Sequence, residues 1–314
     1  MMSDTPGDAP GADTPGESGP DLDGTVAWRA LWAEAAEQLA ATGIEPASVH
    51  ARWIVEEASG MEGAELLLGL DTPATVRGVA HLDHLIGRRL AGEPIQYVLG
   101  HWAFRHLDLL VDRRVLIPRP ETEQVVEAAL AELDRVALGR PDGHRMIAVD
   151  LGTGSGAIAL AVATERPGTR VWGTDRSAEA LAVARANLAG LGMAGSSVRL
   201  AEGSWFDALP AELLGQVDLL VSNPPYVRAD EVLDPSVADW EPVGALVPGT
   251  GLEAYEVIVG GTGAWLAPGG VLVVEIGATQ GTAVVALAEA AGLVDVCVVP
   301  DVAGLDRTVI ARRP

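Results

Sequence analysis

Four consecutive residues, Asn223, Pro224, Pro225 and Tyr226, combine groups that could hold a planar substrate. They follow an apolar run over 217–222 that predicts a buried strand. Open α/β sheets bind their ligands at the carboxyl ends of strands, so these side chains should lie at a ligand-binding edge. The prolines fix their own φ and favour extended backbone at Asn223. The segment therefore predicts a rigid rim that offers the Asn223 side-chain oxygen and the Pro224 carbonyl oxygen beside the ring of Tyr226.

Such a rim suits chemistry on a planar nitrogen. An amide or aniline-like NH2 group is a poor nucleophile because its lone pair is delocalised. Two acceptors could bind its two N–H bonds, orient the nitrogen toward a methyl donor and stabilise the charge that develops there. Tyr226 could stack on the planar group and tolerate a nearby cationic sulfonium. A tight strand-to-loop turn is the simpler interpretation of these four residues, so the rest of the chain must decide.

A glycine-rich segment joins an expected strand, which ends at Leu151, to an expected helix over 157–163. Its residues are Gly152, Thr153, Gly154, Ser155 and Gly156. Glycines let a ligand approach the backbone, and a helix amino terminus attracts an anion. Asp175 ends the next strand about twenty residues on, where a carboxylate can hold ribose hydroxyls. This pattern predicts either a dinucleotide or S-adenosylmethionine, and the glycine segment alone does not separate them.

The fourth expected strand favours S-adenosylmethionine. A dehydrogenase needs a catalytic acid or base there, whereas Asn223 and its neighbours suit methyl transfer to a planar nitrogen. After the third strand, Trp205 and Phe206 are aromatics that could cover an adenine, although simple packing explains them nearly as well.

From residue 146 onward, apolar runs typical of strands alternate with stretches typical of helices. The expected strands are 146–151, 170–174, 197–200, 217–222, 271–276, 294–299 and 306–312. This alternation predicts an α/β fold with a doubly wound, mostly parallel sheet. Ahead of it, a helix is expected over 125–138.

The amino-terminal part has a different character. Residues 1–24 are polar and acidic, and we expect a disordered tail. Residues 25–91 carry apolar side chains at helical spacing, beginning with Trp28 and Leu31, and predict a small helical domain. Residues 92–120 form an expected linker with a β-hairpin, and 121–314 the α/β domain.

Composition narrows the function classes. No segment reaches the ~18 apolar residues that a membrane helix needs, and the acidic amino terminus is not a secretory signal. We therefore expect a cytoplasmic protein. Cys297 is the one cysteine, and because it lies in an apolar run we expect it in the core. A single cysteine cannot form a thiolate metal cluster, and no metal is predicted.

The chain has a formal net charge of −23. Such a charge repels phosphate backbones and makes a nucleic-acid substrate less expected. One local cluster could oppose it: Arg105, His106, Arg113, Arg114 and Arg119. We expect this cluster and the helical domain to serve substrate selection.

Several segments together resemble a known family. They are 92–100, Val115 to Glu123 (Val-Leu-Ile-Pro-Arg-Pro-Glu-Thr-Glu), Asp150 to Gly156, Asn223 to Val227, 266–270 with 275–277, and 301–307. The chain is similar in these to the protein-(glutamine-N5) methyltransferases that modify peptide-chain release factors (the HemK-like family). The similarity runs in order from about residue 26 to the end.

The resemblance implies a class I S-adenosylmethionine-dependent methyltransferase, with a Rossmann-like, mostly parallel, seven-stranded sheet whose last strand is antiparallel. The implied substrate is the glutamine of a Gly-Gly-Gln loop in a class-1 release factor. The implied cofactor contacts come from Gly152 to Gly156, Asp175, Trp205 and Asn223, and Asn223 to Tyr226 would grip the substrate amide, with Asn223, Pro224 and Tyr226 as the catalytic set.

The chain departs from the family's sequence pattern at two places, and two other functions remain alternatives. Thr250 stands where the family usually has an acid before Gly-Leu, and Arg105-His106 follows Phe104 where a small residue is common. An N6-adenine DNA or RNA methyltransferase could use the same grip on a planar NH2, but it would need to flip the base and hold a polyanion. A non-catalytic binding scaffold would not need both the glycine segment (152–156) and the Asn-Pro-Pro-Tyr segment (223–226) to be intact.

Overall fold

The structure is a computed structural model that describes residues 25–246 and 249–314. The tail expected at 1–24 lies outside the described residues. Contacts divide the chain into two compact units, residues 1–87 and 88–314.

The first unit is helical. Its helices are α1 (Trp28–Ala41), α2 (Ala47–Ser59), α3 (Gly63–Gly69) and most of α4 (Val76–Leu90). Leu31, Ala35 and Leu39 recur every four residues along α1 and are buried, as is Ile54 of α2. Trp28, at the start of the same helical spacing, is buried too. The short helix α3 was not predicted.

The second unit begins with a connecting region of three short elements. They are helix α5 (Ile95–Leu99) and the strands β1 (His101–Phe104) and β2 (Leu107–Leu110). The two strands pair antiparallel, as the expected hairpin requires. The turn between them contains only Arg105 and His106.

A seven-stranded sheet forms the centre of the second unit, which confirms the predicted fold class. Its strands are β3 (Ile147–Leu151), β4 (Arg170–Asp175), β5 (Val198–Glu202), β6 (Val217–Ser222), β7 (Leu266–Glu275), β8 (Val294–Pro300) and β9 (Asp306–Arg312). The strand order is β5-β4-β3-β6-β7-β9-β8. β9 runs antiparallel to both of its neighbours, and the strands from β5 to β7 are parallel.

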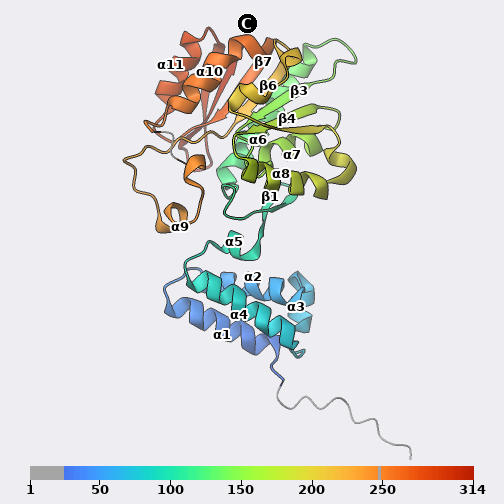
Figure 1. Ribbon diagram of the computed structural model, residues 1–314, viewed down its shortest axis with the longest axis vertical. Helices are drawn as coiled ribbons and strands as arrows, with labels where there is room; N and C mark the ends of the chain where they lie inside the picture. Colours follow the sequence, from blue (N-terminus) through green and yellow to red (C-terminus); the bar gives the residue numbers. More distant parts are fainter. Residues whose placement is uncertain (1–24, 247–248) are drawn as a thin grey trace, which may run out of the picture. The chain divides into compact units, whose positions relative to one another are not determined.

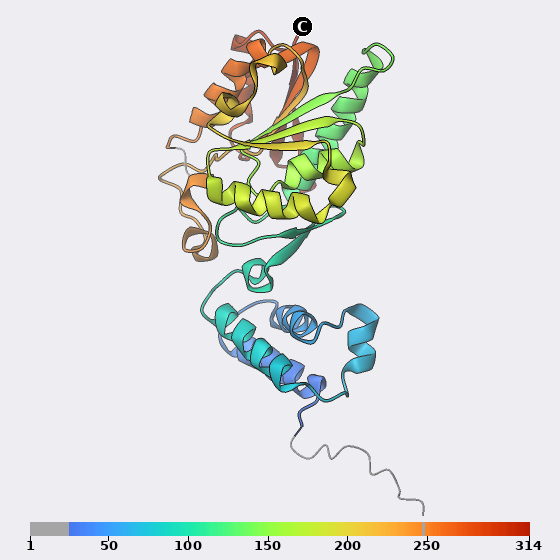
Figure 2. The same cartoon turned by 45° about the vertical axis from the view of Figure 1, so that its right-hand side comes forward.

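Helices cover both faces of this sheet (Figures 1 and 2). They are α6 (Pro120–Leu138), α7 (Ala157–Glu165), α8 (Ala178–Gly190), α10 (Glu253–Trp265) and α11 (Gly281–Ala290), whereas the short helix α9 (Pro235–Ala238) lies in the loop between β6 and α10. Successive residues of β3 point to opposite faces: Ala148 packs with α6 and α7, whereas Val149 packs with α10 and α11. The expectation for Cys297 was wrong, because its side chain is exposed on β8. That strand carries an irregular register at the sheet edge, which leaves its apolar run partly uncovered.

The chain order creates a switch point between β3 and β6. From β3 the chain builds β4 and β5 outward on one side, then returns to place β6 on the other side of β3. The carboxyl ends of these two strands are therefore neighbours, and Ser222 Oγ donates a hydrogen bond of 2.6 Å to the Leu151 carbonyl oxygen. Ligands bind at such switch points.

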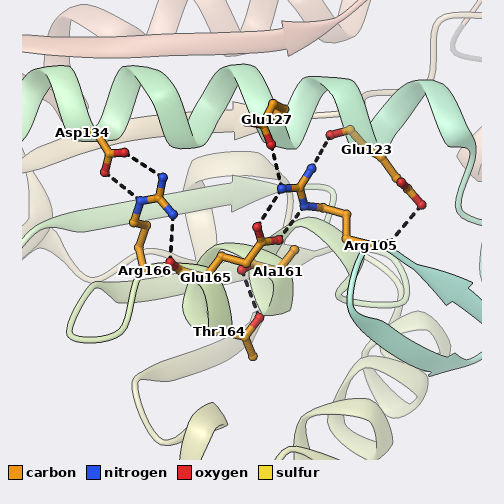
Figure 3. Close-up of polar contacts among 8 residues, drawn as sticks. All are labelled: Arg105, Glu123, Glu127, Asp134, Ala161, Thr164, Glu165 and Arg166. Atoms are coloured by element: carbon orange, nitrogen blue, oxygen red, sulfur yellow. Dashed lines mark hydrogen bonds and ion pairs between the residues drawn. The ribbon is translucent and has the colours of Figure 1, made fainter.

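Arg105 anchors the hairpin turn to the helices beside it (Figure 3). Its guanidinium donates to both carboxylate oxygens of Glu165 on α7, at 2.5 and 2.7 Å, and to Glu127 on α6 at 2.8 Å. Its backbone N–H donates to the Glu123 side chain. Arg105 has a φ of 54°, a left-handed conformation that costs a non-glycine residue about 1–3 kcal/mol. The charged contacts offset that cost, so Arg105 serves the fold and is not free for a partner.

We predict that Arg105→Ala lowers the free energy of unfolding by roughly 2–4 kcal/mol, because it leaves Glu165 and Glu127 without their shared cation, while the backbone N–H that binds Glu123 remains. The Arg105 guanidinium holds the pKa of the Glu165 carboxyl below its usual range. This stabilisation should therefore be complete above the ordinary glutamate pKa of about 4.3 and fade as the pH falls through the lower folded-state value.

Arg166→Ala is the matched control. Arg166 pairs with Asp134 on the same helices, but both side chains are more exposed, so its loss should cost only about 0.2–1 kcal/mol. Denaturant unfolding of both variants checks the difference, and equal effects would contradict the anchoring role.

Candidate functional site

A cavity of about 800 Å³ opens at the switch point between β3 and β6. Its volume is in the range of small-molecule and cofactor sites. The lining comes from segments far apart in the sequence: Arg114 to Leu116, Gly152, Gly154, Asp175 to Ser177, Ala180, Ser204, Trp205, Asn223, Pro225, Pro242, Gly244, Ala245, Glu253, Ala254 and Val257. The fold thus brings the glycine segment and Asn223 to one cavity.

The glycine segment turns sharply between β3 and α7. Gly152, Gly154 and Gly156 have φ values of 76°, 55° and 87°, which side chains rarely adopt. Gly152 and Gly154 present backbone to the cavity, whereas Thr153 and Ser155 are buried behind it. The structure therefore separates the five predicted residues into two that face the cavity and three that hold the turn.

Asp150 holds this turn through buried hydrogen bonds. It is fully buried at the end of β3, and its Oδ2 accepts hydrogen bonds from the Thr153 hydroxyl at 2.6 Å and from the Ala159 N–H at 3.1 Å. Burial raises the pKa of Asp150 to about 7. These bonds tie the loop to the first turn of α7, so the helix amino terminus is held toward the cavity.

Asp175 lies at the end of β4, as expected, and lines the cavity. Its two carboxylate oxygens each accept one backbone hydrogen bond of 2.9 Å, from Gly154 and from Ser177. A carboxylate oxygen can accept a second bond, so Asp175 can hold a ligand hydroxyl while it shapes the glycine turn.

The two aromatic residues after β5 have different roles. Trp205 lines the cavity, and its ring lies 3.6 Å from where a side chain on Gly152 would begin. Phe206 instead stacks on Trp265 in the core, with ring centroids 5.6 Å apart. Of this pair, only Trp205 is placed to contact a ligand.

The loop after β6 divides its residues between two cavities. Asn223 and Pro225 line the first, and Pro224 is buried between them. Tyr226 lines a second cavity of about 420 Å³, together with Arg228, Thr250 and other residues. Tyr226 is thus not among the residues that line the cavity with the glycine segment.

Two residues with contacts to this loop were not singled out from the sequence. Asn223 Nδ2 donates to the Thr122 hydroxyl at 3.2 Å, and that hydroxyl lies 2.7 Å from Glu275 Oε2. Tyr226 donates from its hydroxyl to the other oxygen of Glu275, at 3.5 Å. Both Thr122 and Glu275 belong to the segments that carry the family resemblance, and this was the signal that could have found them.

The arginine cluster expected at 105–119 is not a free basic patch. Arg105 is held by three acids, Arg114 pairs with Asp112, and Arg119 pairs with the buried Glu241. Three of the five cationic residues are therefore neutralised within the protein, which leaves Arg113 and His106 as the part of the cluster that could still oppose the negative net charge. The Arg119 pair also connects the segment before α6 to the 240–245 loop, and both contribute cavity wall.

Arg113 is the most exposed of these arginines, and its guanidinium lies 4.1 Å from the centre of the Trp240 ring.

Residues 25–246 and 249–314 contain no group of three or more acids, histidines or cysteines able to hold a metal ion. Among those same residues, no helix is long and apolar enough to span a membrane.

Two family profiles match the chain. The family profile described as "PrmC N-terminal domain" matches residues 30–100, and "Methyltransferase small domain" matches residues 137–239. A crystal structure of the protein-(glutamine-N5) methyltransferase (release factor-specific) of Alicyclobacillus acidocaldarius is 27% identical. It covers 63% of this chain and 94% of its own, with a TM-score of 0.39.

Curated relatives match nearly end to end. A release factor glutamine methyltransferase of Cereibacter sphaeroides is 44% identical over 89% of this chain and 96% of its own. One from Xylella fastidiosa is 40% identical over 85% and 93%, and one from Moorella thermoacetica is 41% identical over 89% and 96%. Identity of this extent confirms the resemblance seen in the sequence: the chain belongs to the release factor glutamine methyltransferase family.

Proposed function

We propose that this protein transfers a methyl group from S-adenosylmethionine to the side-chain amide nitrogen (N5) of the glutamine in the Gly-Gly-Gln motif of class-1 peptide-chain release factors. The observation that carries the proposal is the shared cavity, in which Asn223 faces the glycine segment and Asp175. The family to which the chain belongs supports the same reaction. Release factors act on the ribosome, so the reaction would take place in the cytoplasm.

The cavity suits S-adenosylmethionine. Backbone at Gly152 and Gly154 and the amino terminus of α7 would hold the methionine carboxylate. Asp175 would bind the ribose hydroxyls, and Trp205 would cover the adenine. When bound, the cofactor supplies an electrophilic methyl group on a sulfonium sulfur.

The rim formed by Asn223, Pro224 and Pro225 would grip the substrate amide. The Asn223 side-chain oxygen would accept one N–H bond and the Pro224 carbonyl oxygen the other, which aims the nitrogen at the cofactor side of the cavity. Both acceptors stabilise the positive charge that develops on nitrogen. A general base is not required, because the proton becomes acidic once the nitrogen is methylated and can pass to water. Tyr226 would contribute its ring from the second cavity, next to the residues that flank the glutamine.

The positions of these residues also suggest which part of the chain binds the cofactor and which selects the substrate. Every residue assigned to the cofactor or to the amide lies in 121–314. We infer that residues 25–91 select the protein substrate and that 92–120 connect them to the methyltransferase domain.

We predict that Asp175→Ala weakens S-adenosylmethionine binding about 10- to 100-fold. The variant removes the charge-assisted hydrogen bonding to the ribose, for a net loss of roughly 1.5–3 kcal/mol, and frees the Gly154 N–H. Glu202→Ala is the matched control, since Glu202 is the exposed acid at the same level of the neighbouring strand β5. Calorimetric titration should show a weaker Kd for the first variant only; tight NADH binding by the wild type would refute the cofactor assignment.

The reaction itself is tested with labelled S-adenosylmethionine. The enzyme receives a class-1 release factor, the same factor with the glutamine of Gly-Gly-Gln replaced by alanine, or adenine-containing DNA or RNA. We expect label only on the intact factor, and mass spectrometry should place the methyl group on the glutamine side-chain nitrogen. Labelled DNA or RNA with an unlabelled release factor would identify an adenine methyltransferase, and no transfer at all would leave a binding scaffold.

A further inference from the structure

We propose that Thr122 and Glu275 are positioning residues that fix which way round the Asn223 amide lies, so that its oxygen and not its NH2 group meets the substrate. The inference rests on the proposed function and goes beyond it, because neither residue lines the cavity.

The three residues come from separate elements. Thr122 is in the first turn of α6, Asn223 follows β6, and Glu275 ends β7. Asn223 Nδ2 is 3.2 Å from Thr122 Oγ1, which is 2.7 Å from Glu275 Oε2. Thr122 is 4% exposed and Glu275 1% exposed, so water does not replace these bonds.

A count of hydrogens gives the chain of bonds a direction. The Thr122 hydroxyl has one hydrogen, and an ionised Glu275 can only accept. Thr122 must therefore donate to Glu275, and it has only acceptor capacity left for Asn223. The Asn223 group beside Thr122 must be NH2, which leaves its oxygen on the other arm of the amide.

The direction matters because a side-chain amide is nearly symmetric in shape. With its two arms exchanged, Asn223 would present N–H bonds to the N–H bonds of a substrate amide. Two donors would then face each other, and the grip proposed above would be lost. The Thr122–Glu275 pair removes this alternative before the substrate arrives, which is the role of preorganisation in catalysis.

Glu275 can perform this task only when it is ionised. A protonated Glu275 could donate to Thr122, whose hydrogen would then be free to bind the Asn223 oxygen and hold the amide the wrong way round. The pKa of Glu275 is raised to about 7: burial is the main cause and the nearby Glu121 adds to it, while the hydrogen bond from Thr122, the charge of Arg307 and the Tyr226 hydroxyl oppose the shift. Tyr255 lies close to this residue, but its hydroxyl donates to the Glu275 backbone carbonyl oxygen at 3.0 Å and not to the carboxyl group.

The test compares Thr122→Val, which keeps the shape but lacks the hydroxyl, with Thr122→Ser, which keeps the hydroxyl. Single-turnover methylation of a release factor is measured with enzyme and cofactor saturating. We expect Thr122→Val to be about 10- to 100-fold slower, as when an outer partner of a site residue is lost. Thr122→Ser should stay within a few-fold of wild type, and both variants should keep the wild-type Kd for S-adenosylmethionine.

The pH profile adds a second measurement, in which Thr122→Val separates the effect of Glu275 from that of Asp150, whose pKa is also raised to about 7. The wild-type single-turnover rate should rise with pH through about 7, as Glu275 ionises, and then level off. Thr122→Val should be slow and lack this rise, because the link to Asn223 is cut.

Each outcome has one meaning. A wild-type enzyme inactive on release factors would refute the proposed function. With an active wild type, a Thr122→Val rate within about threefold, or a Thr122→Ser rate as low as that of Thr122→Val, would overturn the positioning role. If Thr122→Val does not fold, the wild-type profile decides: a rate that is flat from pH 6 to 8 would overturn the part assigned to Glu275.

Discussion

The hydrogen bond from the Ser222 hydroxyl to the Leu151 carbonyl oxygen joins the two strand ends on which the whole site depends. It is buried and 2.6 Å long, and the next residues along the chain are Gly152 on one strand and Asn223 on the other. β3 and β6 are 66 residues apart from end to start (217 minus 151) yet adjacent in the sheet. Because the strands are parallel and in register, the cofactor-facing turn and the amide-gripping rim emerge at the same edge. Neither segment could form the site without the other.

A second constraint is the balance of buried charge. In a chain with a net charge of −23, arginines near the site are used within the protein. Arg105 secures the hairpin turn, and Arg119 holds Glu241 between two walls of the cavity. Glu275 lacks a direct arginine partner among the described residues and is held by hydroxyl groups, so it is the acid whose protonation most directly reaches Asn223.

Much of this architecture could be predicted because its signals are local. Apolar runs located all seven strands of the sheet within a few residues, except that β7 starts five residues earlier than the expected 271. The glycine segment and Asp175 are read from spacing alone. The short helices α3 and α5 were missed because five to seven residues carry too little periodicity to be recognised.

The rest depends on contacts between distant parts of the chain. Nothing local shows that Trp205 turns to the cavity while Phe206 stacks on Trp265, or that Arg105 meets Glu165 sixty residues away. The contact between Thr122 and Glu275 spans 153 residues. Thr122 and Glu275 each lie in a segment that resembles the family. That the two side chains contact each other could be seen only in the folded structure.

The most direct test of the account is single-turnover methylation of a release factor by Asn223→Ala, with cofactor and substrate saturating. Loss of one preorganised acceptor should lower the rate about 10²- to 10³-fold at saturating cofactor, while thermal stability remains close to wild type. A rate within a few-fold of wild type would contradict the account, because Asn223 and the prolines after it would then be only a stiff turn at the end of β6.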